Sequence, residues 1–167
     1  ISYDNRLPSI GTAVPLLREN RLYQTDWLLR FYGFDVRELL NTEYPNLESD
    51  IDPKLSWALR NLDQFPIDIN KADMRMLLRV PGLGVKSVHK IIGARRYRKL
   101  NWENLKSIGA ALNRAKYFIT CDSRIFEGKD RTAAQLKGLI MNSSESKFRK
   151  ELSTQLNLFD NQSLLPK

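Results

Sequence analysis

The chain has 167 residues, 42% of them hydrophobic, and a net charge of +8, so it is long enough to bury one core or two small ones. No apolar run approaches the roughly 20 residues of a membrane span, and no signal-peptide pattern opens the chain. A single cysteine, Cys121, and a single histidine, His89, exclude an internal disulfide and a zinc or iron–sulfur site built from side chains. We expect a cytoplasmic protein with no membrane partner.

The N-terminal part predicts one long helix after an irregular start. Residues 1–17 contain Pro8, Gly11 and Pro15 and little periodicity, so we expect them to be irregular. Residues 18–32 have helical spacing, and Gly33 stands where a left-handed cap ends a helix. The face expected to point inward carries Leu22, Trp27, Leu28 and Phe31.

Two shorter helices are predicted next. One covers residues 35–40, and the other has Asp52 as N-cap and Pro53 at its first position. Pro66 then breaks the chain, and residues 67–70 are expected to form a short extended connector. Because other strand signals are almost absent, the sequence predicts an all-α fold. The inward residues of the second helix are Leu55, Ala58, Leu59 and Leu62.

The positive charge is concentrated in one segment. Residues 71–116 contain twelve Lys or Arg and two acidic residues, a net charge of +10, so the rest of the chain carries −2. Scattered basic residues usually lie on solvated helix faces. An excess confined to 46 residues favours a polyanionic partner instead.

Within this segment, the stretch "VPGLGVKSVHKII" predicts a turn between two helices. Asn70 is expected to cap a first helix that ends at Arg79, and a second helix begins near Gly84. The glycines of "PGLG" permit a tight turn and leave the backbone amides at the start of the second helix accessible. Such amides attract anions. Lys86 and Lys90 point outward, and the inward residues are Val85, Val88, Ile91 and Ile92.

A weaker copy of this pattern follows 27 residues later. Asn101 is expected to cap a helix, Gly109 takes the place of Gly82, and Ala111 takes that of Gly84. Two such turns, related by a pseudo-dyad, suit contacts with phosphates on both strands of a duplex. The alanine adds a Cβ at the point where the second turn would approach a phosphate.

From "IN-x-A" through "PGLG" to the second copy, the segment resembles the tandem helix-hairpin-helix module, which implies sequence-independent binding of duplex DNA. The resemblance implies phosphate contacts through backbone amides and basic side chains. It also implies that backbone carbonyls of Leu78, Val80 and Leu83 hold a monovalent cation. The implied phosphate-binding residues are Gly82, Leu83, Gly84, Val85, Lys86, Ser87, Lys90, Gly109, Ala111, Asn113 and Arg114.

A second resemblance covers about residues 7–121. The stretches "PLLRENRLYQTDWLLRFYGF", "DIDPKLSWALRN" and "YFITC" are similar to the C-terminal part of DNA modification or repair radical-SAM proteins. This implies a larger parent enzyme whose iron–sulfur cluster and S-adenosylmethionine belong to a preceding barrel, since this chain has one cysteine and starts with Ile1. No cofactor and no catalytic residue are expected here. The expected divisions are an irregular segment 1–17, a helical region 18–66, the hairpin domain 67–121, and C-terminal helices and tail 122–167.

Two other functions compete with DNA binding. In a helix-hairpin-helix DNA glycosylase, Lys86 would be the nucleophile, but the position near 104 where such enzymes carry an aspartate holds Asn104. A protein-docking helical module is the other alternative, against which the charge of the segment argues. Surface exposure is the default for His89, burial for Cys121, and core or interface packing for the aromatics near Trp27.

The C-terminal region ends in a short motif. Residues 131–141 and 144–156 are expected to form two helices. The pentapeptide Gln155, Leu156, Asn157, Leu158 and Phe159 resembles the bacterial sliding-clamp-binding motif, which implies the clamp as a partner. The alternative is a helix end that buries Leu156 and Phe159, and the sequence leaves both open.

Overall fold

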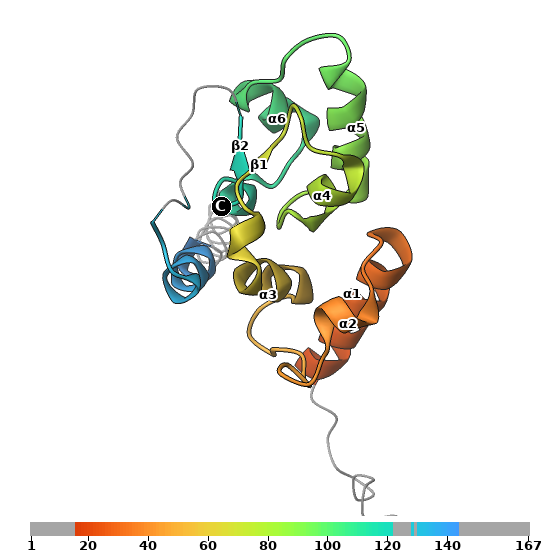
Figure 1. Cartoon of the computed structure of the whole chain (residues 1–167), viewed down its shortest axis with the longest axis vertical. Helices are drawn as coiled ribbons and strands as arrows, with labels where there is room; N and C mark the ends of the chain where they lie inside the picture. The colour runs from red at the N-terminus through yellow and green to blue at the C-terminus, as the bar shows by residue number, and fades with distance from the viewer. Residues whose placement is uncertain (1–15, 122–127, 129, 144–167) are drawn as a thin grey trace, which may run out of the picture.

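The computed structural model describes residues 16–121, 128 and 130–143, and these are mostly helical (Figure 1). None of the described helices has the length and apolarity needed to cross a membrane. The elements are α1 (Leu16–Phe31), α2 (Val36–Leu39), α3 (Pro53–Arg60), a 3-10 turn (Leu62–Gln64), β1 (Ile67–Asp68), α4 (Met74–Arg79), α5 (Val85–Arg95), α6 (Trp102–Ile108), α7 (Leu112–Ala115) and β2 (Ile119–Thr120), followed by a helix over residues 133–143.

The helix boundaries in the N-terminal half follow the predicted signals. Gly33 has φ +64° and ends α1 in the left-handed conformation. The Asp35 side chain caps α2 and forms a capping box with Glu38. Asp52 caps α3 by accepting from the backbone N–H of Leu55 at 2.9 Å, with Pro53 in the first turn. The predicted helices at these positions are therefore confirmed.

The predicted inward face of α1 is largely wrong. Leu28 is buried, but Leu22, Trp27 and Phe31 are each at least half exposed. The helix instead buries Thr25 with Leu28, because it packs on α3 through that narrow stripe. The apolar side chains beside the stripe remain largely exposed, so α1 presents an exposed aromatic face.

The basic segment contains two successive pairs of helices, which we call the first and second hairpins. The first joins α4 to α5 and the second joins α6 to α7, with α5 packed against both α4 and α6 (Figure 1). Asn101 caps α6 as predicted. The cap of α4 is Asp73 and not Asn70, because the Asn70 amide instead bridges to Leu100, accepting from its N–H at 2.8 Å and donating to its carbonyl at 3.0 Å.

A two-stranded parallel ladder closes the hairpin unit. The extended connector after Pro66 is β1, and it pairs Ile67 with Ile119 and Asp68 with Thr120 of β2. The second strand was not predicted, because two residues are too short for a period-2 pattern. The ladder brings the end of α7 back to the start of the hairpins and leaves the all-α class unchanged.

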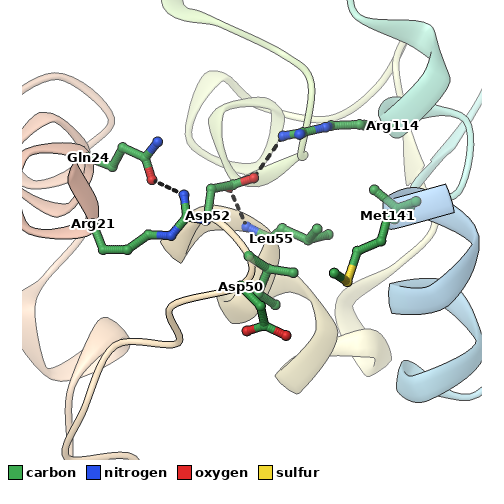
Figure 2. Close-up of a pocket in the computed structure, with 9 residues that line it drawn as sticks. Arg21, Gln24, Asp50, Asp52, Leu55, Arg114 and Met141 are labelled. Carbon is green, nitrogen blue, oxygen red and sulfur yellow. Dashed lines mark hydrogen bonds and ion pairs between the residues drawn. The ribbon is translucent and has the colours of Figure 1, made fainter. Parts of the chain in front are cut away.

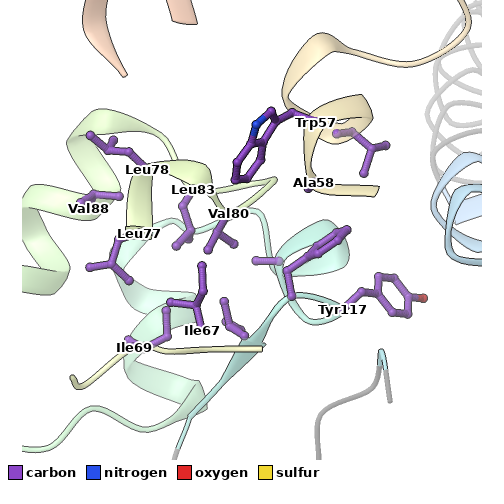
Figure 3. Close-up of a cluster of buried hydrophobic side chains, with 14 of the residues drawn as sticks. Trp57, Ala58, Ile67, Ile69, Leu77, Leu78, Val80, Leu83, Val88 and Tyr117 are labelled. Atoms are coloured by element: carbon purple, nitrogen blue, oxygen red, sulfur yellow. The ribbon is translucent and has the colours of Figure 1, made fainter. Parts of the chain in front are cut away.

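One hydrophobic core runs from α3 into the first hairpin. Figure 3 shows Trp57 and Ala58 of α3 facing the side chains around the hairpin turn. Burial of these side chains stabilises the turn and fixes its position relative to α3. The cluster includes Ile67, Ile69, Leu77, Val80, Leu83 and Val88.

A buried arginine links the N-terminal helices to the hairpins. The Arg79 side chain is 2% exposed, and its guanidinium donates to the carbonyls of Tyr32 at 3.2 Å and Gly33 at 3.1 Å. It also pairs with the Glu38 carboxylate at 2.7 Å. The guanidinium lies 3.8 Å from the ring centroid of Phe34, so its faces contact aromatic carbon while its edge is hydrogen-bonded.

The helix over residues 133–143 packs on the same core. Leu136 and Ile140 are buried, and Lys137 Nζ lies 2.6 Å from Glu48 and 2.8 Å from Asp50. The predicted helix in this region is confirmed. Of the expected irregular segment 1–17, residues 16–17 belong instead to the first turn of α1, and residues 1–15 lie outside the described residues. The expected helix at 144–156 and the clamp-like motif from Gln155 to Phe159 also lie outside them.

We predict that Arg79→Met destabilises the protein by about 3 kcal/mol, because it removes the only charged partner shown for Glu38 among the described residues and the donors of two carbonyls. The measurement is urea unfolding followed by circular dichroism. Arg75→Met, on the exposed side of the same helix, is the matched control and is expected to change stability by less than about 0.5 kcal/mol. Equal effects of the two substitutions would contradict the role of Arg79.

Candidate nucleic-acid interface

α5 begins without the side-chain cap that four other helices have. Four helices begin with an aspartate or asparagine whose side chain accepts from a first-turn amide: α2, α3, α4 and α6. The N-cap of α5 is Gly84, and no described side chain caps this helix. Its first-turn amides therefore stand at the positive end of an eleven-residue helix with no competing carboxylate or amide oxygen from a cap.

The two glycines of "PGLG" have different roles. Gly82 has φ +88°, and a Cβ there would lie 2.6 Å from the carbonyl oxygen of Ala111. Its own carbonyl accepts from the Ala111 N–H at 3.1 Å, so Gly82 joins the two hairpin turns. Gly84 has φ −89°, and a Cβ there would meet only the Tyr32 hydroxyl, at 3.8 Å. Gly84 is thus the open position, while Gly82 is required for packing.

The second hairpin repeats this backbone but uses its amides internally. Gly109 has φ +86°, close to the value at Gly82. The Gly109 N–H donates to the carbonyls of Leu105 and Lys106. The Ala111 N–H donates to the Gly82 carbonyl, and the Arg114 N–H donates to the Ala111 carbonyl. α7 has only four residues. The expected phosphate contacts through the amides of the second turn therefore have no support from this geometry, and the first turn carries the site.

Most of the basic residues of the segment lie on the surface. Eight of the twelve are exposed: Lys71, Arg75, Lys86, Lys90, Arg96, Arg98, Lys99 and Lys106. Three others have structural contacts instead. Arg79 is buried, Arg95 donates to the carbonyls of Ile69 at 3.2 Å and Ala72 at 2.5 Å, and Arg114 pairs with Asp52 at 2.8 Å. The exposed set includes the predicted Lys86 and Lys90 of α5.

Lys54 approaches the hairpin turn from α3. Its side chain is almost fully buried, and Nζ donates to the Leu83 carbonyl at 2.6 Å. The ammonium also lies 4.6 Å from the ring centroid of Tyr32. Burial lowers the pKa of Lys54 to about 7, which Asp52 opposes and Arg79 reinforces.

Two of the three carbonyls expected to hold a monovalent cation, those of Val80 and Leu83, accept hydrogen bonds from the chain. Leu83 accepts from Lys54, and Val80 accepts from the N–H of Leu83 at 3.2 Å. The Lys54 ammonium is thus bound to the Leu83 carbonyl, one of the three expected cation ligands. Sequence reasoning missed Lys54, although a lysine in the first turn of a helix opposes the helix dipole and is a signal that something else holds it there.

The N-terminus of α3 is a junction between three elements. Asp52 accepts from Leu55 N–H and pairs with Arg114, and Figure 2 shows it between Arg114 on one side and Arg21 and Gln24 of α1 on the other. A pocket of about 300 Å³ lies here, closed by Met141 from the C-terminal helix. Arg114, expected to contact phosphate, is thus held by an internal carboxylate.

The predicted exposure of His89 and burial of Cys121 are both confirmed. His89 is exposed on α5, and Cys121 is buried with its thiol donating to the Leu100 carbonyl at 3.0 Å.

Comparison of the chain with family models, with curated proteins and with solved structures found no match. The assignment of function therefore rests on the geometry of the first hairpin and on its sequence.

We predict a rank order for alanine at three glycines. Gly82→Ala is expected to cost the most, over about 2 kcal/mol, because both its φ and its contact with Ala111 are incompatible with a side chain. Gly109→Ala is expected to cost about 1 kcal/mol, since only its φ of +86° is unfavourable. Gly84→Ala should leave stability nearly unchanged. Thermal unfolding of the three variants tests the order, and a large loss for Gly84→Ala would refute it.

A second prediction concerns pH. Because the pKa of Lys54 is about 7 in the folded protein and near 10.5 when unfolded, the unfolded chain binds more protons between these values. Stability should therefore rise with pH in this range, by up to about 1.4 kcal/mol per pH unit from this group. Lys54→Met removes the effect.

The measurement for Lys54 is urea unfolding of both proteins at pH 6, 7.5 and 9. The difference in unfolding free energy is expected to shift in favour of the wild type as pH rises. Lys86→Met, which removes an exposed lysine from α5, serves as the control for loss of a lysine. A difference between wild type and Lys54→Met that stays constant with pH would show that Lys54 is not desolvated.

Proposed function

We propose that this chain is a sequence-independent duplex-DNA-binding module of the tandem helix-hairpin-helix type. The observation that carries the proposal is the uncapped N-terminus of α5, which begins at Gly84 and lies beside Lys86 and Lys90 on the outer face of the helix. Backbone amides at the positive end of a helix bind phosphate without reading bases, which fits binding to any sequence.

The surrounding charge supports a polyanion in place of a small anion. The exposed lysines and arginines lie along α4 and α5, in the turn after α5 and on α6, so they extend well beyond one phosphate. Such a distribution gives long-range attraction and salt-dependent affinity. In this proposal the second hairpin acts mainly by fixing the first turn through Gly82 and Ala111, and less by contacting phosphate itself.

The proposed role is binding and not catalysis. A nucleophilic lysine must be a neutral amine, which desolvation favours, and Lys86 is exposed. This weighs against a glycosylase that uses Lys86. From the resemblance described above, we propose further that the module serves a larger radical-SAM-type DNA modification or repair enzyme, which would hold the iron–sulfur cluster and S-adenosylmethionine, and that the C-terminal motif binds a sliding clamp.

The test is a salt titration of binding to a duplex of arbitrary sequence. With four to six phosphates contacted, log K against log salt is expected to have a slope of about −4 to −5. Duplexes of different sequence should bind within about threefold of one another. A shallow slope with retained binding would favour the protein-docking alternative and contradict the proposal.

A double variant, Lys86→Glu with Gly84→Val, locates the site. It should abolish duplex binding because it reverses a charge and places a side chain over the open amides. Its fold should persist, since Gly84 has a negative φ and a Cβ there meets only the Tyr32 hydroxyl. Arg37→Glu, an equal charge change on an exposed position of α2, is the matched control. Undiminished affinity in the double variant would remove this hairpin from the mechanism.

A further inference from the structure

A pocket of about 440 Å³ lies beside the first hairpin, between α1, the start of α3 and α7. It is within the size range of small-molecule sites in proteins. Three separate elements contribute its walls, so it exists only in the folded chain. Its lining combines aromatic rings, side-chain amides and charged groups: Asn20, Tyr23, Gln24, Trp27, Tyr32, Asp52, Lys54 and Arg114 are among the residues that form it.

One wall of the pocket is formed by aromatic side chains of α1 that are exposed to solvent. Tyr23 and Trp27 are 62% and 59% exposed, and Phe31 continues the same stripe at helical spacing. The Trp27 and Phe31 rings lie 4.7 Å apart, which holds the tryptophan in place. Exposed, rigid rings of this kind bind flat partners by stacking, and every nucleobase has such a face.

The rest of the lining is polar and contains charges of both signs, from Asp52, Lys54 and Arg114. Asp52 holds the Arg114 guanidinium at 2.8 Å, and that side chain remains 41% exposed. Arg21 donates to the Gln24 oxygen at 2.9 Å, and Figure 2 shows the Gln24 nitrogen pointing away from Arg21. Fixed amide and guanidinium donors of this kind suit the edge of a base and the phosphate beside it.

Tyr32 connects the pocket to the proposed phosphate site. Its ring lines the pocket and lies against the Lys54 ammonium, while its hydroxyl is the nearest group to the open face of Gly84. A phosphate bound at the start of α5 would therefore lie on the side of Tyr32 that faces Gly84, with the pocket on the ring of the same residue.

We propose that this pocket receives a single unpaired nucleobase, turned out of a DNA duplex that the hairpin holds by its backbone. This inference rests on the proposed function and goes beyond it, because it predicts a preference among DNA structures. A paired base stays in its stack, whereas a bulged base is already free to leave it, so the bulged site avoids the cost of unstacking.

The test measures affinity of the full chain for three DNAs of one sequence: a paired duplex, the same duplex with a one-nucleotide bulge, and a bulge with an abasic nucleotide. The bulged duplex is expected to bind roughly tenfold more tightly than the paired duplex, because stacking of one base on an aromatic side chain adds binding free energy of about that size. The abasic bulge should lose that preference, because it has the same flexibility but no base.

Trp27→Ala and Tyr23→Ala should reduce the ratio of bulged to paired affinity towards one while leaving paired-duplex affinity unchanged. Both residues are exposed, so the fold should tolerate alanine. Tyr97→Ala is the matched control: this aromatic is 91% exposed and outside the pocket, so its loss should not alter the ratio. A 2-aminopurine at the bulge should lose fluorescence on binding wild type but not Trp27→Ala.

The outcomes separate the two proposals. If paired duplex binds but the bulge has no advantage, or if Trp27→Ala keeps the advantage, the pocket inference is wrong and the aromatic stripe is a protein-packing surface. If no duplex binds, or if the Lys86→Glu and Gly84→Val double variant binds as well as wild type, the hairpin proposal fails first. An equal preference for base-containing and abasic bulges would show recognition of bent DNA and refute a base pocket.

Discussion

The buried guanidinium of Arg79 is the constraint on which the arrangement of the chain depends. It lies at the end of α4, yet its hydrogen bonds go to the turn after α1 and to Glu38 of α2. α2 and α4 have four and six residues, too few to be stable as isolated helices. One side chain that satisfies two carbonyls and a carboxylate, with an aromatic ring beneath it, fixes where α1 lies relative to the first hairpin.

Lys54 repeats this solution at the turn of the same hairpin. Its ammonium donates to the Leu83 carbonyl inside the turn, as Arg79 donates to the carbonyls of the turn after α1. The two buried cations repel each other, and Arg79 contributes to the lowered pKa of Lys54. Buried charges are unfavourable unless hydrogen-bonded. Here both are hydrogen-bonded, Lys54 to the hairpin turn and Arg79 to the turn after α1, so the two buried charges fix these turns in place.

Local signals were predictable from the sequence, and distant ones were not. The neighbours of Asp52 within a few residues indicate a helix cap, and those of the glycines at 33, 82 and 109 indicate a turn. The structure shows that cap and a positive φ at each of the three glycines. The buried roles of Arg79 and Lys54 depend on partners 29 to 47 residues away, which no periodicity reveals. The same limit explains the error at α1: spacing identifies an apolar face, but only the fold decides whether a neighbour covers it.

The distribution of helix caps supplies a physical reason for the location of the proposed site. Four helices have an aspartate or asparagine cap, and these residues compete with any external anion for the same amides. α5 lacks that competitor, at a position where a cap would stabilise the helix by about 1 kcal/mol. α7 also lacks a side-chain cap, but it has only four residues. α5 is the longer of these two uncapped helices, and it begins beside exposed lysines and an open aromatic pocket, where a ligand can replace the cap.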